Sequence, residues 1–516
     1  MKYWSLLLFI FVANSAWSSY QFEDLPRYLD EGQYYQCAEF APKRPIKVAI
    51  IDLYFGDNLE EKRGKSLPLD FEVLNPEYNQ SEDMSGYHAF YTAEVLHEYM
   101  SRGGECPENS AKMYLIPYSG YTQFSEAVDA AIAKDVDVIL YTIVWNAFGN
   151  GDGTGFINQV ANRALDAGIT WINAAGNFQR NVWQGDLKRA DGQLTFGRED
   201  KLYIECMPSE GNECSLLAYL SWNDFKNDPE QGTTKDLNFV LVDEVDEKVR
   251  SSSRIQMQSL EQANKIGNTA TIYPYEFIRI SPKDRGRKLK KGRRYAFKIY
   301  AESTDWSYED FFRLSVEGEG IRLLSPSPDK PNTIFPPADN PRVISVGAYD
   351  AELSSYYERG SFLKPEILGV SKIVRDNKTY LGSSVTATLY AAQFALLKNR
   401  MPNASEEEVR RAVETRFQSY PKCNYEIDIG PDFGAIYDLK QTGIHLKAVV
   451  GPEMIYILTP SNPYRLFGIE YSSYKQAGYS LDEGFTTWSS REIRRLDPKR
   501  NFILLEDNGS YRTCPQ

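Results

Sequence analysis

The hydrophobic pattern up to about residue 178 alternates between short continuous apolar runs and longer amphipathic stretches. Continuous runs are typical of strands buried on both faces of a sheet, whereas apolar residues spaced three and four apart are typical of covering helices. The predicted strands are residues 46–51, 136–144 and 169–175, and the predicted helices are residues 88–102, 124–133 and 156–167. Gly168 is suitably placed to end the last helix. The alternation predicts a parallel sheet with right-handed crossovers.

The pattern changes between residues 179 and 330, where short alternating runs are separated by polar turns. The predicted strands there are residues 215–222, 237–242, 272–280, 295–300 and 311–316. Such spacing favours an inserted antiparallel β-sandwich. Parallel-sheet character returns at residues 343–350 and 364–369, followed by a buried helix up to residue 397 and another over 405–415. The remaining residues contain short strand-like runs, such as 454–458 and 502–505, and predict a small β-rich module.

The chain has 516 residues, with 58 Lys and Arg against 71 Asp and Glu, so that its formal net charge is −13. This acidic balance argues against a nucleic-acid partner. Residues 1–18 have the features of a secretory signal peptide, namely a lysine, a short apolar run and small residues. That run is too short for a permanent membrane span, so we expect a secreted or periplasmic protein without a membrane span.

The six cysteines suit an oxidising compartment. Cys206 and Cys214 are eight residues apart and predict a local disulfide. By proximity alone, Cys37 would pair with Cys106, and Cys423 with Cys514. The spacings do not match a zinc site, and no metal ligands are predicted.

Four polar residues stand where the predicted sheet would place reactive groups. Ser384 follows Gly382 at the start of the buried helix, where unsatisfied N–H groups favour a nearby negative charge. Asp52 ends the first strand, and His88 opens the first helix; His97, nine residues on, should point away from His88. Asn177 follows the 169–175 strand. Each has a simpler structural interpretation: a helix cap for Ser384, a turn or cap for Asp52, a structural histidine for His88, and a Gly-Asn turn for Asn177.

The order Asp, His, Asn, Ser resembles that of subtilisin-like serine peptidases. Residues 47–52 resemble the aspartate box of that family, and residues 85–88 resemble its histidine box. Residues 174–177 are similar to its oxyanion motif, and residues 382–387 to its serine box. The resemblance extends over residues 46–177 and 332–400, and does not include the insert or the C-terminal part.

The resemblance implies a role for each of these residues. Ser384 would be the nucleophile, His88 the general base and then acid, and Asp52 the group that orients the imidazole. The Asn177 side chain and the Ser384 backbone N–H would form the oxyanion hole. Thr142 and Gly176 would bind a polypeptide substrate, which is hydrolysed through an acyl-enzyme. Subtilisin-like proteins often bind calcium, but no ligands can be assigned here, and no other cofactor is expected.

The expected fold class is α/β, a subtilisin-like parallel sheet flanked by helices, with an inserted antiparallel β-sandwich and a small β-rich C-terminal module. A signal peptide at 1–18 precedes a catalytic domain in two parts, 19–183 and 332–416. The insert spans 184–331, and the C-terminal module spans 417–516. The ends of the insert should lie close together.

A second function stays open, namely a catalytically silent subtilisin-like scaffold that binds peptide or surface ligands. It is suggested by Phe90 in the histidine box, by Val144, where the family usually has glycine, and by the large accessory modules. An α/β-hydrolase esterase is disfavoured because the second glycine of its G-x-S-x-G motif is missing and the acid precedes the serine. The basic loop at residues 285–294 is interpreted either as a solvated hairpin or as a contact for an anionic surface.

Overall fold

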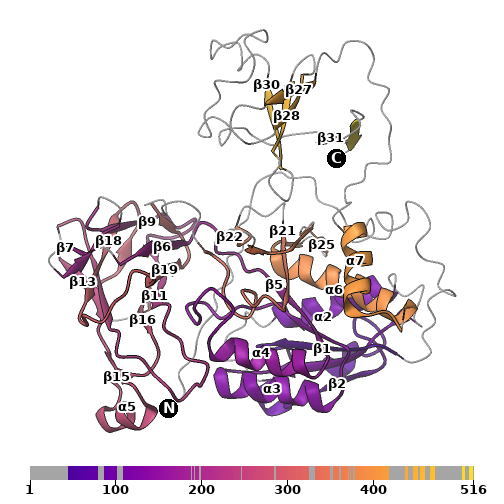
Figure 1. The fold of residues 1–516 in the computed structure, drawn as a ribbon, viewed down its shortest axis with the longest axis horizontal. Coiled ribbons are helices and arrows are strands. Elements are labelled where there is room, and N and C mark those ends of the chain that lie inside the picture. Colours follow the sequence, from indigo (N-terminus) through magenta and orange to yellow (C-terminus); the bar gives the residue numbers. More distant parts are fainter. Residues whose placement is uncertain are drawn as a thin grey trace. The chain divides into compact units, whose positions relative to one another are not determined.

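The computed structural model describes residues 45–417 and the strands beyond them (Figure 1). Within 45–417 the undescribed positions are 80–86, 102–108, 188, 191, 197–198, 246, 284–285, 325–331, 349–352, 360–361, 370, 372, 376–377 and 402. The chain divides into two compact units, Met1–Val413 and Glu414–Gln516. The expected signal peptide and the pairings Cys37–Cys106 and Cys423–Cys514 lie outside the described residues.

A seven-stranded parallel sheet forms the centre of the first unit, in the order β2-β3-β1-β4-β5-β21-β24. Its strands are β1 (Lys47–Asp52), β2 (Phe71–Val73), β3 (Lys112–Pro117), β4 (Val138–Tyr141), β5 (Thr170–Ala174), β21 (Ile344–Ala348) and β24 (Ile367–Gly369). Every neighbouring pair is parallel. The parallel α/β architecture expected from the sequence is therefore confirmed, and it is consistent with a subtilisin-like fold.

Helices cover both faces of this sheet, which explains the continuously apolar strands. Helices α3 (Tyr121–Ala133) and α4 (Phe156–Asp166) pack together on one face, and α2 (Tyr87–Ser101) and α6 (Ser383–Arg400) on the other (Figure 1). Gly168 follows α4 with φ +82°. Its N–H donates to the Leu165 carbonyl and that of Ile169 donates to the Ala164 carbonyl, so the helix ends in a Schellman motif at the glycine that the sequence predicts as its end.

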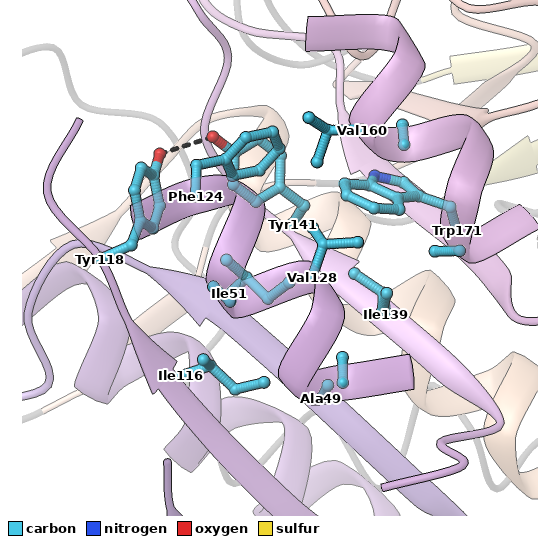
Figure 2. Close-up of a cluster of buried hydrophobic side chains, with 14 of the residues drawn as sticks. Ala49, Ile51, Ile116, Tyr118, Phe124, Val128, Ile139, Tyr141, Val160 and Trp171 are labelled. Atoms are coloured by element: carbon cyan, nitrogen blue, oxygen red, sulfur yellow. Dashed lines mark hydrogen bonds between the residues drawn. The ribbon is translucent and has the colours of Figure 1, made fainter. Parts of the chain in front are cut away.

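The core beneath α3 and α4 is rich in aromatic side chains. Phe124 of α3 lies among Tyr118, Tyr141 and Trp171, as Figure 2 shows. The Tyr118 and Tyr141 hydroxyls are hydrogen-bonded at 2.5 Å. Burial raises the pKa of both phenols, so they remain neutral donors and acceptors at physiological pH.

Besides two pairs of two-residue strands, the segment between β5 and β21 contains two large antiparallel sheets. One has the order β16-β11-β19-β6, and the other is built on β13-β12-β18-β8-β7, with β9 joining β18 to β20. The strands are β6 (Val182–Asp186), β7 (Arg189–Ala190), β8 (Gln193–Leu194), β9 (Leu202–Cys206), β11 (Leu216–Trp222), β12 (Leu237–Val242), β13 (Lys248–Ser252), β16 (Tyr275–Ile280), β18 (Arg294–Ala301), β19 (Phe311–Glu317) and β20 (Ile321–Leu323). Side chains of both sheets share one apolar core.

Covalent and polar contacts close this insert. Cys206 and Cys214 form the expected disulfide, with S–S 2.11 Å. The Asn332 N–H donates to Gln184 Oε1 at 3.0 Å, so the chain returns to the sheet beside the point where it left.

Several elements differ from the sequence prediction. The strand expected at 136–144 ends at Tyr141, and of the 364–369 segment only Ile367–Gly369 joins the parallel sheet; Lys364 belongs to the antiparallel hairpin β22 (Tyr357–Arg359) and β23 (Phe362–Lys364). The strands β2 and β3 and the insert helix α5 (Leu260–Ile266) were not predicted. Helix α7 (Glu406–Phe417) agrees with the sequence prediction.

In the second unit, an antiparallel sheet has the order β27-β28-β29-β30, and β31 pairs with β32. The strands are β27 (Ile436–Leu439), β28 (Leu446–Val450), β29 (Met454–Thr459), β30 (Arg465–Glu470), β31 (Phe502–Leu505) and β32 (Tyr511–Cys514). The apolar runs at 454–458 and 502–505 thus coincide with strands.

Candidate active site

Asp52 lies at the carboxyl end of β1 and is only 2% exposed. Its Oδ1 accepts the Leu53 N–H at 2.7 Å. Its Oδ2 accepts the Thr142 hydroxyl at 2.9 Å and lies 3.0 Å from His88 Nδ1. If His88 carries a proton on Nδ1, all three neighbours donate hydrogen bonds to the Asp52 carboxylate. An ionised carboxylate can only accept hydrogen bonds, so these neighbours suit it.

His88 is the second residue of α2, and its side chain is one-fifth exposed. With the proton of Nδ1 directed to Asp52, Nε2 has the lone pair that a general base requires. Thr92, one turn later, donates its hydroxyl to the His88 carbonyl at 3.0 Å. His97 is buried elsewhere along the helix, and burial lowers its pKa to about 4.

Ser384 is the second residue of α6, which begins after Gly382. Its Oγ donates to the Thr142 carbonyl at 3.1 Å. Thr142 therefore bonds Asp52 through its hydroxyl and Ser384 through its carbonyl. Asp52, His88 and Ser384 thus come from β1, α2 and α6 to one place at the carboxyl edge of the sheet.

Asn177 and Gly176 both contact Ser383, the residue before the candidate nucleophile Ser384. The Ser383 N–H donates to Asn177 Oδ1 at 3.1 Å, and the Gly176 N–H donates to Ser383 Oγ at 3.0 Å. With Oδ1 engaged, Nδ2 is the donor that Asn177 can offer to a substrate oxygen. Gly382 has φ +130°, and a Cβ there would lie 3.0 Å from Asn177 Nδ2, so this position requires glycine.

The sequence predicts only substrate binding for Thr142, and its bond to Asp52 is seen only in the structure. The register provides the reason for that bond: Ile51 is level with Tyr141 across β1 and β4, so Asp52 and Thr142 leave neighbouring strands together. The hydrogen bond from the Gly176 N–H to Ser383 is likewise not predicted by the sequence. Neither can be deduced without the strand order.

The two unusual residues of the boxes have ordinary surroundings. Phe90 is partly exposed, 5.8 Å from the Tyr91 ring. Val144 is 5% exposed in an apolar cluster with Phe178 and Phe335. Its Cγ2 would lie 3.3 Å from a Cβ at Gly176, so Val144 packs tightly against that glycine.

The basic loop of the insert is partly neutralised by its own domain. Arg287 is within 3.3 Å of Asp243 and also pairs with Glu247. Lys288 Nζ donates to the Ser281 carbonyl at 3.2 Å. These contacts favour the solvated-hairpin interpretation of the described part of the loop; residues 284 and 285 lie outside it.

Over the described part of the chain, no cluster of three or more His, Cys, Asp or Glu side chains is arranged to hold a metal ion. Among the same residues, no helix has the length and hydropathy needed to span a membrane.

No protein-family model matches the chain, and no curated protein does. Among solved structures, the chain is similar to the CspB protease of Clostridium perfringens, with 14% identity and a TM-score of 0.42 over 68% of this chain and 81% of that one. It is also similar to the MycP3 protease from the type VII (ESX-3) secretion system, with 14% identity and a TM-score of 0.30 over 77% and 80%. Similarity at this level does not identify a function, which has to be inferred from the geometry of the site.

Proposed function

We propose that this protein is a secreted serine endopeptidase of the subtilisin type. The observation that carries the proposal is that Thr142 bonds both Asp52 and Ser384, while His88 Nδ1 lies 3.0 Å from the same Asp52 carboxylate. A buried carboxylate that fixes the imidazole tautomer, next to a serine at a helix N-terminus, is the arrangement needed for acyl transfer.

In the proposed reaction, the Ser384 hydroxyl turns from the Thr142 carbonyl toward His88 Nε2. His88 takes its proton as Oγ attacks the peptide carbonyl, and Asp52 stabilises the imidazolium. The Asn177 Nδ2 group and the Ser384 N–H bind the oxyanion. His88 then gives its proton to the leaving amine, and water hydrolyses the acyl-enzyme by the same steps.

The bond from Ser384 to the Thr142 carbonyl favours a second function, that of a silent peptide-binding scaffold. If the hydroxyl stays on that carbonyl, it is not activated by His88. Peptide recognition would then remain without hydrolysis.

Labelling with a fluorophosphonate probe separates these functions. The purified full chain should be labelled, while Ser384→Ala should not be labelled, and His88→Ala should label at least about a hundredfold more slowly. Both variants should melt near the wild-type temperature. Absence of labelling in the wild type would reject the peptidase and favour the scaffold.

A further inference from the structure

Strand β19 of the insert is buried on both of its faces. Phe312, Leu314 and Val316 point into the apolar core shared by the two insert sheets. The alternate side chains, Arg313, Ser315 and Glu317, are only 2%, 2% and 6% exposed. A polar face buried to this extent must be satisfied by specific partners.

The partners of Arg313 belong to segments outside the insert. Its Nη2 donates to the Gly149 carbonyl at 2.6 Å, and its Nη1 donates to the Ile334 carbonyl at 3.1 Å. The guanidinium also lies 4.6 Å from the centroid of the Phe335 ring. One insert side chain thus joins the loop after β4 to the segment that leads into β21.

Asn146 is held at both ends of its amide by the same strand. The Ser315 hydroxyl donates to Asn146 Oδ1 at 2.8 Å, and Asn146 Nδ2 donates to Glu317 Oε1. Asn146 is 8% exposed and lies four residues after Thr142. Because acceptor and donor are both engaged, the side chain has a single orientation.

The residues between Thr142 and Asn146 are fixed as well. The Trp145 N–H donates to the Pro336 carbonyl at 2.8 Å. Val144 packs in a cluster that includes Val182 of β6 and Ile334. The chain that follows the candidate site is therefore enclosed by the two ends of the insert and by β19.

We propose that Arg313, Ser315 and Glu317 are positioning residues that set the course of residues 142–149 and so shape peptide binding beside Ser384. The inference rests on the proposed function, since it takes residues 142–144, which follow β4, as the segment along which a substrate lies. The insert would then act on binding through the backbone of this segment, without contacting the peptide itself.

The test compares Glu317→Ala with a matched variant, Glu276→Ala. Glu276 is an equally buried insert carboxylate, but its partners Ser252, Arg254 and Gln256 all belong to the insert. Glu317→Ala should raise the apparent KM for fluorescein-labelled casein about tenfold, because the Asn146 amide loses its acceptor. Its labelling by a small fluorophosphonate should stay within about twofold of wild type. Glu317→Gln, which keeps a carbonyl acceptor, should restore the KM, and Glu276→Ala should leave it unchanged.

A second readout does not require activity. Hydrogen exchange in peptides covering residues 142–151 should be faster in Glu317→Ala than in wild type and unchanged in Glu276→Ala. Unchanged exchange in Glu317→Ala would overturn the positioning role, as would altered exchange with an unaltered KM. An unlabelled wild-type chain instead overturns the proposed peptidase, so the two failures are distinguishable.

Discussion

At the scale of single residues, Thr142 connects the parts of the candidate site. Its hydroxyl donates to the carboxylate that faces His88, and its carbonyl accepts from Ser384. Hydrogen bonds to a buried charge are worth more than bonds between neutral groups. Removing this hydroxyl should therefore weaken the support of the carboxylate that orients the imidazole.

We expect Thr142→Val, which keeps the side-chain shape, to slow fluorophosphonate labelling of Ser384 by about tenfold to a hundredfold, because Asp52 loses a donor. The matched control is Thr233→Val. Thr233 is also a buried threonine that donates to an aspartate, Asp224, but it lies in the insert. Equal labelling rates in the two variants would show that the Thr142 hydroxyl does not support the site.

The residues of the site were more predictable than their contacts. Asp52, His88, Asn177 and Ser384 each stand at the end of a strand or the start of a helix, which a hydrophobic pattern marks. The contact between Asp52 and Thr142 depends on β1 lying next to β4. The local hydrophobic pattern does not determine the order of strands in a sheet. The structure brings the four together, while their catalytic roles remain predictions.

At the scale of elements, β19 shows where pattern reasoning fails. Its alternation of apolar and polar residues predicts a strand with one face in solvent. In the structure that polar face is buried against the loop after β4. Strand β3 is not predicted for a different reason. Its residues Met113, Leu115 and Pro117 leave it poor in the β-branched residues typical of strands.

Burial of β19 also has a consequence for stability. Burial raises the pKa of Glu317 to about 7 from 4.5, although the bond from Asn146 opposes the shift. The folded state thus keeps a proton that the unfolded chain loses above pH 4.5, and stability falls as pH rises from about 4.5 to 7.

Glu317→Gln, which mimics the protonated form and does not titrate, should become more stable relative to wild type over this range. The gain should reach at most about 3 kcal/mol and then level off above pH 7. Denaturant unfolding of both proteins at pH 5, 6, 7 and 8 measures it. A difference that stays constant with pH would mean that Glu317 ionises normally.

At the scale of the whole molecule, side chains of the insert pack against the loop after β4 of the parallel-sheet domain. The two ends of the insert lie close together, where the Asn332 N–H donates to Gln184. This closeness alone would allow the insert to be deleted and the chain rejoined. However, removal would take Arg313 away from the Phe335 ring and the Gly149 carbonyl, and would leave the Asn146 amide without Ser315 and Glu317.

Deleting residues 184–331 and joining the ends should therefore lower the melting temperature by about 10 °C or more, since each buried polar group left without a partner costs about 1–3 kcal/mol. Circular dichroism melting of the deleted and full chains provides the measurement. A melting temperature equal to that of the full chain would make the insert an independent appendage.

The two-sided burial of β19 also limits how such a protein can be recombined. A chimaera that takes its insert from another protein and keeps residues 142–151 from this chain would place foreign side chains against Asn146 and Gly149. The natural unit of exchange is therefore the insert together with that loop, although the two are separated in the sequence. Breakpoints chosen by chain continuity alone would divide a single packed unit.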